Sequence, residues 1–292
     1  MKMMNEITSD HISRAVGEIA KIKPDYRLLL GLYEKIFIEQ ERSKKAVHLG
    51  DLRIPDETLH LKQKEKFPLV ETSRFVVDNE AAGALFIALC AILEEAGGEI
   101  SESVRKLKDA AGNNRFVPSD LFAAFLGGDD AVLKDIENEY AINGRILAFL
   151  IYNSIKPSLN LFSAAMSGYL GEDEWDRGYC PVCGSMPELS IFEEKGKRSL
   201  LCGFCGHKWP SKRLYCPFCE NTDHETLRYF EIEDEEEYRV EVCEKCKCFL
   251  KTVDINKTSR TTYLPLESIS TPYIDLKFQE MGYKSANIQI DK

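Results

Sequence analysis

The sequence predicts an α+β fold, in which an all-helical N-terminal domain is followed by two small β modules and a C-terminal helix. Residues 1–170 contain one cysteine, and segment after segment of them carries apolar residues at helical spacing. The region that follows contains four Cys-x-x-Cys pairs, separated by short stretches of strand-like composition. We therefore expect a helical domain at 1–170, metal modules at 171–213 and 214–255, and a helix with a tail at 256–292.

Proline and glycine divide the N-terminal domain into its expected helices. Ser9 or Asp10 caps the first helix, and Pro24 separates it from a second that continues to about Lys45. Residues 50–77 are less regular. Further helices are expected at Asn79 to Ala96, Ser101 to Ala111, Pro118 to Gly127, Asp129 to Ser154, Leu159 to Tyr169 and, after the cysteines, Ile274 to Met281. We expect Pro157 to end the longest of them and the N-terminal helices to pack as one bundle.

The longest apolar run, Ala81 to Leu93, has 13 residues and is flanked by Glu80 and Glu94. It is too short to span a bilayer and is typical of a buried helix. Cys90 lies in this run, so we expect a buried thiol there rather than a reactive one.

Composition favours a soluble globular protein, and the N-terminus and the cysteines favour the cytoplasm. The chain has 292 residues, is 44% hydrophobic and 29% charged, and carries a formal net charge of −10. Such a charge disfavours binding of the whole molecule to nucleic acid or anionic lipid. The residues Met1 to Glu6 lead into no apolar signal core, so the cysteines are expected to be reduced thiols in a cytoplasm.

Four cysteine pairs fall within 67 residues: Cys180/Cys183, Cys202/Cys205, Cys216/Cys219 and Cys243/Cys246. Two thiolates three positions apart can bind one ion from a tight turn, and two such turns complete a tetrahedral site. A redox dithiol would explain one pair but not four. The first three pairs also contain the proline or glycine that favours such a turn. The sequence therefore predicts two four-sulfur metal sites.

Three pairings of the turns are possible, and neighbouring pairs close the shortest loops. Site 1 then uses Cys180, Cys183, Cys202 and Cys205, and site 2 uses Cys216, Cys219, Cys243 and Cys246. Strand-like segments lie between the turns at Glu188 to Phe192, Ser199 to Leu201, Leu227 to Phe230 and Tyr238 to Val242. Each unit is predicted to be a β ribbon clamped by one ion, as in zinc ribbons and rubredoxins. Metal ligation would supply about 10 kcal/mol per site, most of the folding free energy of such short units.

Tetrahedral sulfur suits iron and zinc equally, so the expected cofactors are two iron or zinc ions, each bound by four cysteines. A catalytic zinc needs an open coordination position, which four cysteines deny it. The sequence also contains no phosphate loop, nucleophile elbow or His-Glu-x-x-His motif. We therefore expect that this protein is not an enzyme.

Three other features have two interpretations each, and a fourth has one. The basic stretch from Lys195 to Arg213, with Trp209 in it, is a nucleic-acid surface or local compensation for the thiolates, and we favour compensation. The acidic stretch from Glu231 to Glu237 is typical of a solvated hairpin tip. His207 is an alternative ligand or a neighbour of the ligands, and Cys248 is a substitute for Cys246 or a spare thiol; we favour the second interpretation in both cases.

The cysteine region resembles the formate dehydrogenase accessory protein family, FdhE. The resemblance lies in Trp175 to Pro187, Arg198 to Cys205, Trp209, Arg213, Cys216, Cys219, Cys243 to Cys246, Leu250 and Lys251, and in the N-terminal segment Phe67-Pro68-Leu69-Val70. It implies a helical domain followed by two rubredoxin-like modules, with the eight paired cysteines as metal ligands. It also implies a cytoplasmic assembly factor, or chaperone, that contacts the catalytic subunit of formate dehydrogenase or of a related molybdenum or tungsten enzyme.

Two other functions stay open at this point. One is a zinc-ribbon protein that binds nucleic acid, which would show strongly salt-dependent binding. The other is a rubredoxin-like electron carrier or thiol oxidoreductase, which would show a reversible redox couple without a client protein.

Overall fold

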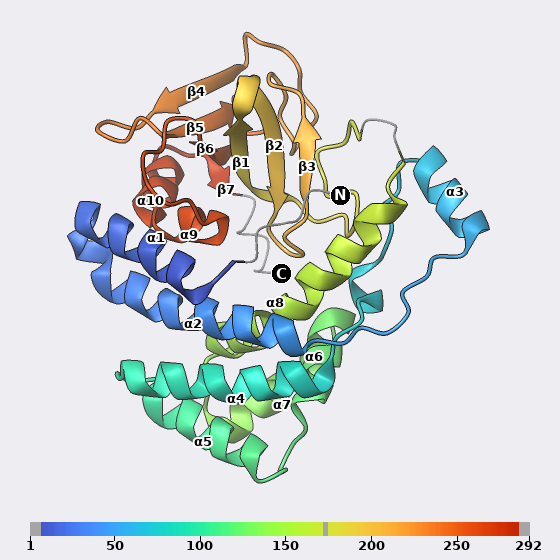
Figure 1. Cartoon of the computed structure of the whole chain (residues 1–292), viewed down its shortest axis with the longest axis vertical. Helices are drawn as coiled ribbons and strands as arrows, with labels where there is room; N and C mark the ends of the chain where they lie inside the picture. The colour runs from blue at the N-terminus through green and yellow to red at the C-terminus, as the bar shows by residue number, and fades with distance from the viewer. Residues whose placement is uncertain (1–6, 172–174, 286–292) are drawn as a thin grey trace. The chain divides into compact units, whose positions relative to one another are not determined.

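The computed structural model describes residues 7–171 and 175–285; the expectation about a signal core falls on residues 1–6, outside these ranges. The chain divides into two compact units (Figure 1). Unit 1 comprises Met1–Leu52 and Glu71–Phe162, and unit 2 comprises Arg53–Val70 and Ser163–Lys292. The segment Arg53–Val70, which the sequence suggests is part of the helical domain, thus groups with the sheet. None of the helices in the described ranges is long and apolar enough to cross a membrane.

Unit 1 is helical and has its core around one central helix. Its helices are α1 (Ser9–Ile22), α2 (Arg27–Ala46), α4 (Asn79–Ala96), α5 (Ser101–Gly112), α6 (Pro118–Gly127), α7 (Asp130–Tyr140) and most of α8 (Gly144–Met166), with the short 3₁₀ turns η1 (Pro24–Tyr26) and η2 (Thr72–Arg74). The apolar helix α4 contacts α2, α5 and α6 and buries Phe86 and Leu89 completely. Cys90 is also fully buried, and burial raises the pKa of its thiol to about 12, as expected for an unreactive cysteine.

Several predicted boundaries are confirmed and others need correction. Helix α4 has the predicted bounds, while the cap of α1 is Thr8, whose hydroxyl accepts a hydrogen bond from the backbone N–H of His11. The helix predicted from Asp129 to Ser154 is wrong. The chain leaves the helical conformation at Ala141, which has a left-handed φ of 51°, and α8 begins only at Gly144.

Pro157 does not end a helix, because α8 continues through it to Met166. A proline in a helix leaves the carbonyl four residues earlier without its N–H partner, here the carbonyl of Asn153. The buried side chain of Gln40 on α2 supplies the missing donor: its Nε2 lies 2.9 Å from that carbonyl oxygen and 3.0 Å from Asn153 Oδ1. A side chain more than a hundred residues away therefore stabilises the helix where local sequence predicts its end.

We expect Gln40→Met to lower the free energy of unfolding by about 1–3 kcal/mol, because it leaves the Asn153 carbonyl buried without a donor. In a Pro157→Ala background, the backbone N–H of residue 157 can donate to the Asn153 carbonyl. Gln40→Met should then lower the free energy of unfolding by less. Urea unfolding of the four proteins in this double-mutant cycle measures both costs. Equal costs in the two backgrounds would contradict this explanation.

Unit 2 is built on a seven-stranded sheet with the order β3-β2-β1-β6-β5-β4, in which β7 also pairs with β6. Its elements are α3 (Asp56–Lys64), η3 (Ser167–Tyr169), β1 (Pro187–Glu193), η4 (Glu194–Gly196), β2 (Lys197–Cys202), β3 (Lys208–Ser211), β4 (Leu227–Glu231), β5 (Tyr238–Cys243), β6 (Cys248–Asp254), α9 (Leu264–Ile269), α10 (Pro272–Glu280) and β7 (Lys284–Ser285). The four predicted strands and the final helix are confirmed, as is the α+β class. The strands β3, β6 and β7 and the helices α3 and α9 were not predicted.

The two predicted ribbons are merged into one sheet. Strands β1, β2 and β3 form one antiparallel meander, and β4, β5 and β6 form the other. Parallel pairing of β1 with β6, including Ser190 opposite Thr252, joins them. One face of the sheet forms a core with α10, where Val240, Phe249 and Phe278 are buried together. The acidic stretch forms the β4–β5 hairpin tip, as expected.

Candidate metal centres

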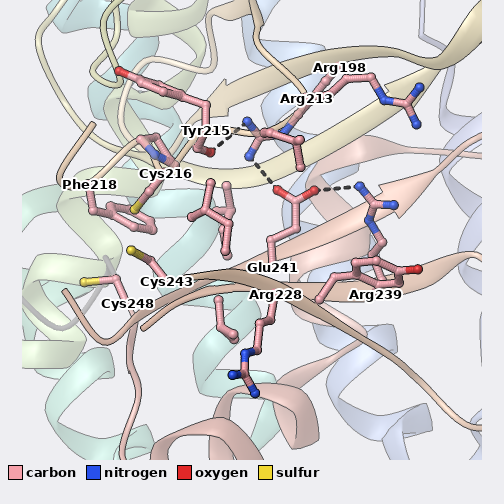
Figure 2. Close-up of a pocket in the computed structure, with 16 residues that line it drawn as sticks. Arg198, Arg213, Tyr215, Cys216, Phe218, Arg228, Arg239, Glu241, Cys243 and Cys248 are labelled. Atoms are coloured by element: carbon pink, nitrogen blue, oxygen red, sulfur yellow. Dashed lines mark hydrogen bonds and ion pairs between the residues drawn. The ribbon is translucent and has the colours of Figure 1, made fainter. Parts of the chain in front are cut away.

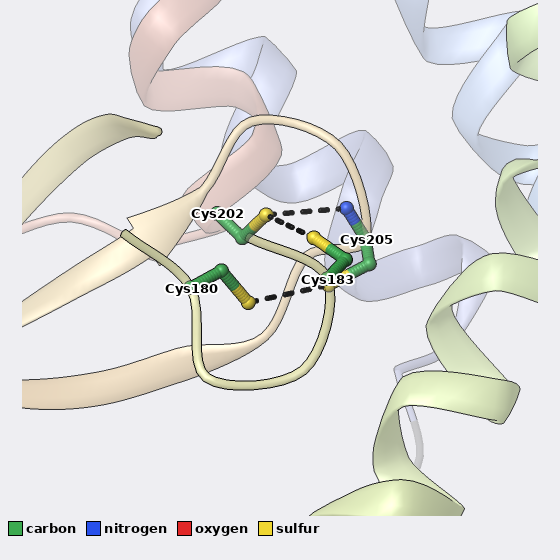
Figure 3. A group of neighbouring side chains, drawn as sticks. All are labelled: Cys180, Cys183, Cys202 and Cys205. Carbon is green, nitrogen blue, oxygen red and sulfur yellow. Dashed lines mark hydrogen bonds between the residues drawn. The ribbon is translucent and has the colours of Figure 1, made fainter. Parts of the chain in front are cut away.

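Site 1 brings together the sulfurs of Cys180, Cys183, Cys202 and Cys205, all of them buried (Figure 3). The first two lie on the turn before β1, whereas Cys202 is the last residue of β2 and Cys205 lies on the turn between β2 and β3. The Sγ atoms of Cys180 and Cys205 are 3.7 Å apart, and those of Cys183 and Cys202 are 3.5 Å apart. The neighbouring turns thus share one site, in the arrangement expected from loop length.

Site 2 repeats this arrangement with Cys216, Cys219, Cys243 and Cys246. The Sγ atoms of Cys216 and Cys246 are 3.6 Å apart, and those of Cys219 and Cys243 are 3.7 Å apart. Cys219 and Cys246 are only partly buried, so site 2 is more open than site 1.

Both clusters fit a tetrahedral ion. Metal–sulfur bonds of about 2.3 Å place tetrahedral sulfurs about 3.8 Å from one another. Within each cluster all four Sγ atoms lie within 4.8 Å of one another, and the ten cysteines are free of disulfides. Burial raises the pKa of the Cys180 and Cys202 thiols. Four thiolates at such distances require a cation to offset their mutual repulsion. The two clusters could therefore each hold a metal ion; that these eight cysteines are its ligands stays a prediction.

The four turns have one backbone conformation. In each, the residue after the second cysteine donates its N–H to the carbonyl of the first cysteine, as Gly184 does to Cys180 at 2.9 Å. That residue has a positive φ in every turn: Gly184, Gly206, Glu220 and Lys247. Site 1 uses glycine, which adopts this conformation without strain, whereas site 2 uses side chains that rarely adopt it. The turn of Cys243 and Cys246 thus has the same geometry as the others, although it contains neither proline nor glycine.

Polar hydrogens surround the sulfurs. The backbone N–H groups of Phe204 and Cys205 each lie 3.4 Å from the Sγ of Cys202. At site 2 the buried amide of Asn221 lies 3.5 Å from the Sγ of Cys243. Burial raises the pKa of the Cys243 thiol, but backbone N–H groups and Asn221 outweigh burial and lower it to about 7. Such donors favour thiolate, the form that binds metal. No sequence motif indicates the role of Asn221.

A segment distant in sequence covers the first turn of site 1. The backbone N–H groups of Leu69 and Val70 donate to the carbonyls of Pro181 and Val182, both at 2.9 Å. The hydroxyl of Tyr179 also donates to the carbonyl of Lys66 at 2.8 Å. We call residues 66–70 the strap. The motif Phe-Pro-Leu-Val marks it in the sequence, but nothing there indicates that it lies against the cysteines.

Gly178 lies where the chain before site 1 passes the third turn. A Cβ added at Gly178 would lie 1.8 Å from the carbonyl oxygen of Pro217. Because that oxygen belongs to the backbone between Cys216 and Cys219, a larger residue would displace either site 2 or the chain leading to Cys180.

We expect Gly178→Ala to lower the free energy of unfolding by at least about 1–3 kcal/mol, the usual cost of overpacking. Gly168→Ala is the matched control, because a Cβ at Gly168 meets nothing within 4 Å. Urea unfolding of both variants, with metal content measured in parallel, provides the comparison. Equal stability of the two variants would show that the backbone at Gly178 relaxes freely.

A buried arginine on β2 joins the two meanders. The Arg198 guanidinium donates to Glu241 Oε2 on β5 at 2.5 Å and to Ser190 Oγ on β1 at 3.0 Å. It also donates to the carbonyls of Lys212 and Tyr215, at 2.8 and 3.2 Å, in the chain that leads to Cys216. Arg198 thus fixes the approach to site 2 from the strand that ends in a ligand of site 1. The sequence suggested only that it belongs to a basic stretch.

The remaining candidates lie outside the ligand sets. Trp209 is buried in the sheet and stacks on His207, which is not among the clustered metal-ligating atoms. Lys208 pairs with Glu193 at 2.6 Å. Trp209 and Lys208 of the basic stretch therefore make contacts within the sheet. Cys248 lies near site 2, with its Sγ 3.8 Å from the carbonyl oxygen of Cys246, but is not one of the four clustered cysteines.

A helical unit together with a sheet that carries two closed four-cysteine clusters defines a zinc-ribbon type of protein. Comparisons with known proteins identify a particular relationship. Residues 179–213 match a family described as "FdhE, central domain". The crystal structure of the FdhE protein from Pseudomonas aeruginosa shares the fold, with a TM-score of 0.65 over 96% of this chain and 95% of that one, at 21% sequence identity.

Curated relatives carry the same name. The FdhE homolog of Aquifex aeolicus is 30% identical over 149 residues, which are 50% of this chain and 52% of that protein. The FdhE protein of Escherichia coli O127:H6 is 29% identical over 140 residues, 45% of this chain and 44% of that protein. The chain thus spans about half the length of the curated relatives it matches. These findings confirm the resemblance to the FdhE family.

Proposed function

We propose that this chain is a non-enzymatic accessory protein in formate dehydrogenase maturation, which binds the catalytic subunit of that enzyme, or of a related molybdenum or tungsten enzyme, in the cytoplasm. The observation that carries the proposal is the pair of closed four-cysteine clusters within the FdhE fold. Four sulfurs complete a tetrahedral shell and leave no open position for a substrate, which supports a structural role for the metal rather than a catalytic one. Cysteines that form no disulfide in the described ranges also fit a reducing compartment.

The proposed ligands are the eight clustered cysteines, with one iron or zinc ion in each site. When bound, the ion supplies the positive charge that holds four thiolates together. The chain itself supplies the turns, the N–H donors to sulfur and the strap that shields site 1. Metal analysis and a visible absorption spectrum distinguish the two metals, because ferric ions bound by four thiolates absorb visible light and zinc does not.

The structure favours this function over nucleic-acid binding. Of the predicted basic surface, Arg198 is buried in an ion pair with Glu241, and Trp209 is buried and therefore cannot stack on a base. The acidic hairpin tip would also repel a phosphate backbone.

Purification of the tagged 292-residue chain from its host tests the proposal. We expect the catalytic subunit of formate dehydrogenase, or of a related metalloenzyme, to co-purify with the metal-loaded protein, and purified subunit to bind it directly. Binding of DNA or RNA at low salt, without binding of any such subunit, would contradict the proposal.

A further inference from the structure

Beside site 2, the sheet has a hollow on the face opposite α10. It contains about 490 Å³ of space, including its open mouth, and lies between the chain before Cys216 and the strands β4, β5 and β6 (Figure 2). Its apolar lining comes from Leu214, Phe218, Leu227, Tyr229 and Leu250. We call it the β4 hollow. Leu214 and Tyr229 are 61% and 59% exposed, an unusual state for large apolar side chains that lie so close together.

Two guanidinium groups are held in place at the rim of the β4 hollow. Arg213 and Arg239 both lie over the ring of Phe192, at 5.6 and 4.1 Å from its centre, and Arg239 also lies 5.2 Å from the centre of the Tyr229 ring. Contact with aromatic rings orients a guanidinium while leaving its N–H groups available. The two arginines are therefore pre-organised for an anionic group.

The charge at this rim is only partly balanced. Glu241 lies between Arg198 and Arg239, and its carboxylate binds both (Figure 2). The Nε of Arg239 is buried and has no hydrogen-bond partner, and Arg213 forms no ion pair with any residue in the described ranges. The lining of the hollow thus contains four arginines, Arg198, Arg213, Arg228 and Arg239, and one carboxylate, Glu241, in a protein whose net charge is −10. A further carboxylate from a ligand would complement this rim.

The neighbouring strand β4 offers backbone groups as well. In the described part of the chain β4 pairs only with β5, so its other edge is open. An extended peptide can add to such an edge through main-chain hydrogen bonds and place alternate side chains in adjoining pockets.

We propose that the β4 hollow binds an extended peptide segment of a partner protein, with an acidic side chain against Arg213 and Arg239 and an apolar side chain against Leu227 and Leu250. This inference rests on the proposed function, since the partner is then the catalytic subunit. An inorganic anion would satisfy the arginines but would use neither the apolar lining nor the open edge of β4.

Two synthetic probes test the hollow without the partner. They are the peptides Ser-Val-Leu-Glu-Val-Ser and Ser-Val-Leu-Gln-Val-Ser, titrated into the full metal-loaded chain labelled with ¹⁵N. We expect the glutamate peptide to shift the β4 amide signals and the Nε signal of Arg239, and to bind about fivefold or more tightly than the glutamine peptide. An Arg213→Gln/Arg239→Gln variant should lose this preference, whereas Arg105→Gln, on α5 in unit 1, should keep it.

Three outcomes would overturn the inference: no shifts with either peptide, equal binding of the two, or the same shifts from sulfate at equal concentration. A second measurement separates it from the proposed function. If purified catalytic subunit binds wild type and the double arginine variant equally, the inference fails while the function stands. If the peptides bind as expected but the subunit binds no form of the chain, the function fails while the site stands.

Discussion

A chain carrying Cys180→Ser and Cys183→Ser is expected to bind one metal ion instead of two. Hydroxyl groups are poor ligands for a soft tetrahedral site, and two remaining thiolates cannot enclose an ion. The loss removes metal-binding free energy on the order of 10 kcal/mol from the turns before β1 and after β2. Elemental analysis of the purified variant measures the metal content directly.

The same substitution should release the strap. The carbonyls that bind Leu69 and Val70 belong to Pro181 and Val182, the two residues between the replaced cysteines. When that turn unfolds, the backbone of residues 66–70 loses these hydrogen bonds and becomes accessible to proteases. We expect limited proteolysis to cut the variant within residues 53–70 under conditions that leave the wild type intact.

Cys248→Ser is the matched control for the metal count. Because Cys248 is not one of the four clustered sulfurs of site 2, this variant should keep two ions. Two ions in the Cys180→Ser/Cys183→Ser protein would refute the ligand assignment of site 1, and one ion in Cys248→Ser would make Cys248 a ligand of site 2.

Arg198→Ala is expected to lower the free energy of unfolding by about 3–5 kcal/mol, the usual cost of removing one partner of a buried ion pair. The Arg198 side chain is 1% exposed, and its removal leaves Glu241 without that partner and the carbonyls of Lys212 and Tyr215 without this donor. Since these carbonyls lie in the chain that leads to Cys216, site 2 should also lose its metal to a chelator more rapidly. Urea unfolding and the rate of metal transfer to a chelator measure the two effects.

Lys197→Ala is the control on the same strand, because Lys197 is exposed; it should change the stability by less than about 0.5 kcal/mol. A cycle with Glu241→Ala separates the ion pair from the other contacts of Arg198. A cost below about 1 kcal/mol for Arg198→Ala would mean that the two meanders stay joined without it.

The elements that were predicted correctly are those whose limits are determined by their own residues and their immediate neighbours in the sequence. Helix α4 is apolar on all sides and is bounded by an aspartate cap and two glycines, so its limits could be predicted from its own residues. The continuation of α8 through Pro157 could not be predicted from nearby residues, because the donor that replaces the proline's missing N–H is Gln40, 117 positions earlier in the chain. The strand β6 was missed because the pairing that makes it central comes from β1 and β5, not from its own pattern.

The sequence by itself determined the two four-cysteine clusters and their pairing, because three-residue spacing and short loops make neighbouring sulfurs meet. Only the tertiary structure decided what surrounds them. The parallel pairing of β1 with β6 merges two ribbons into one sheet, the strap covers site 1, and Arg198 connects the meanders. These contacts join residues that are far apart in the chain, and their free energy depends on burial and geometry that no local pattern contains.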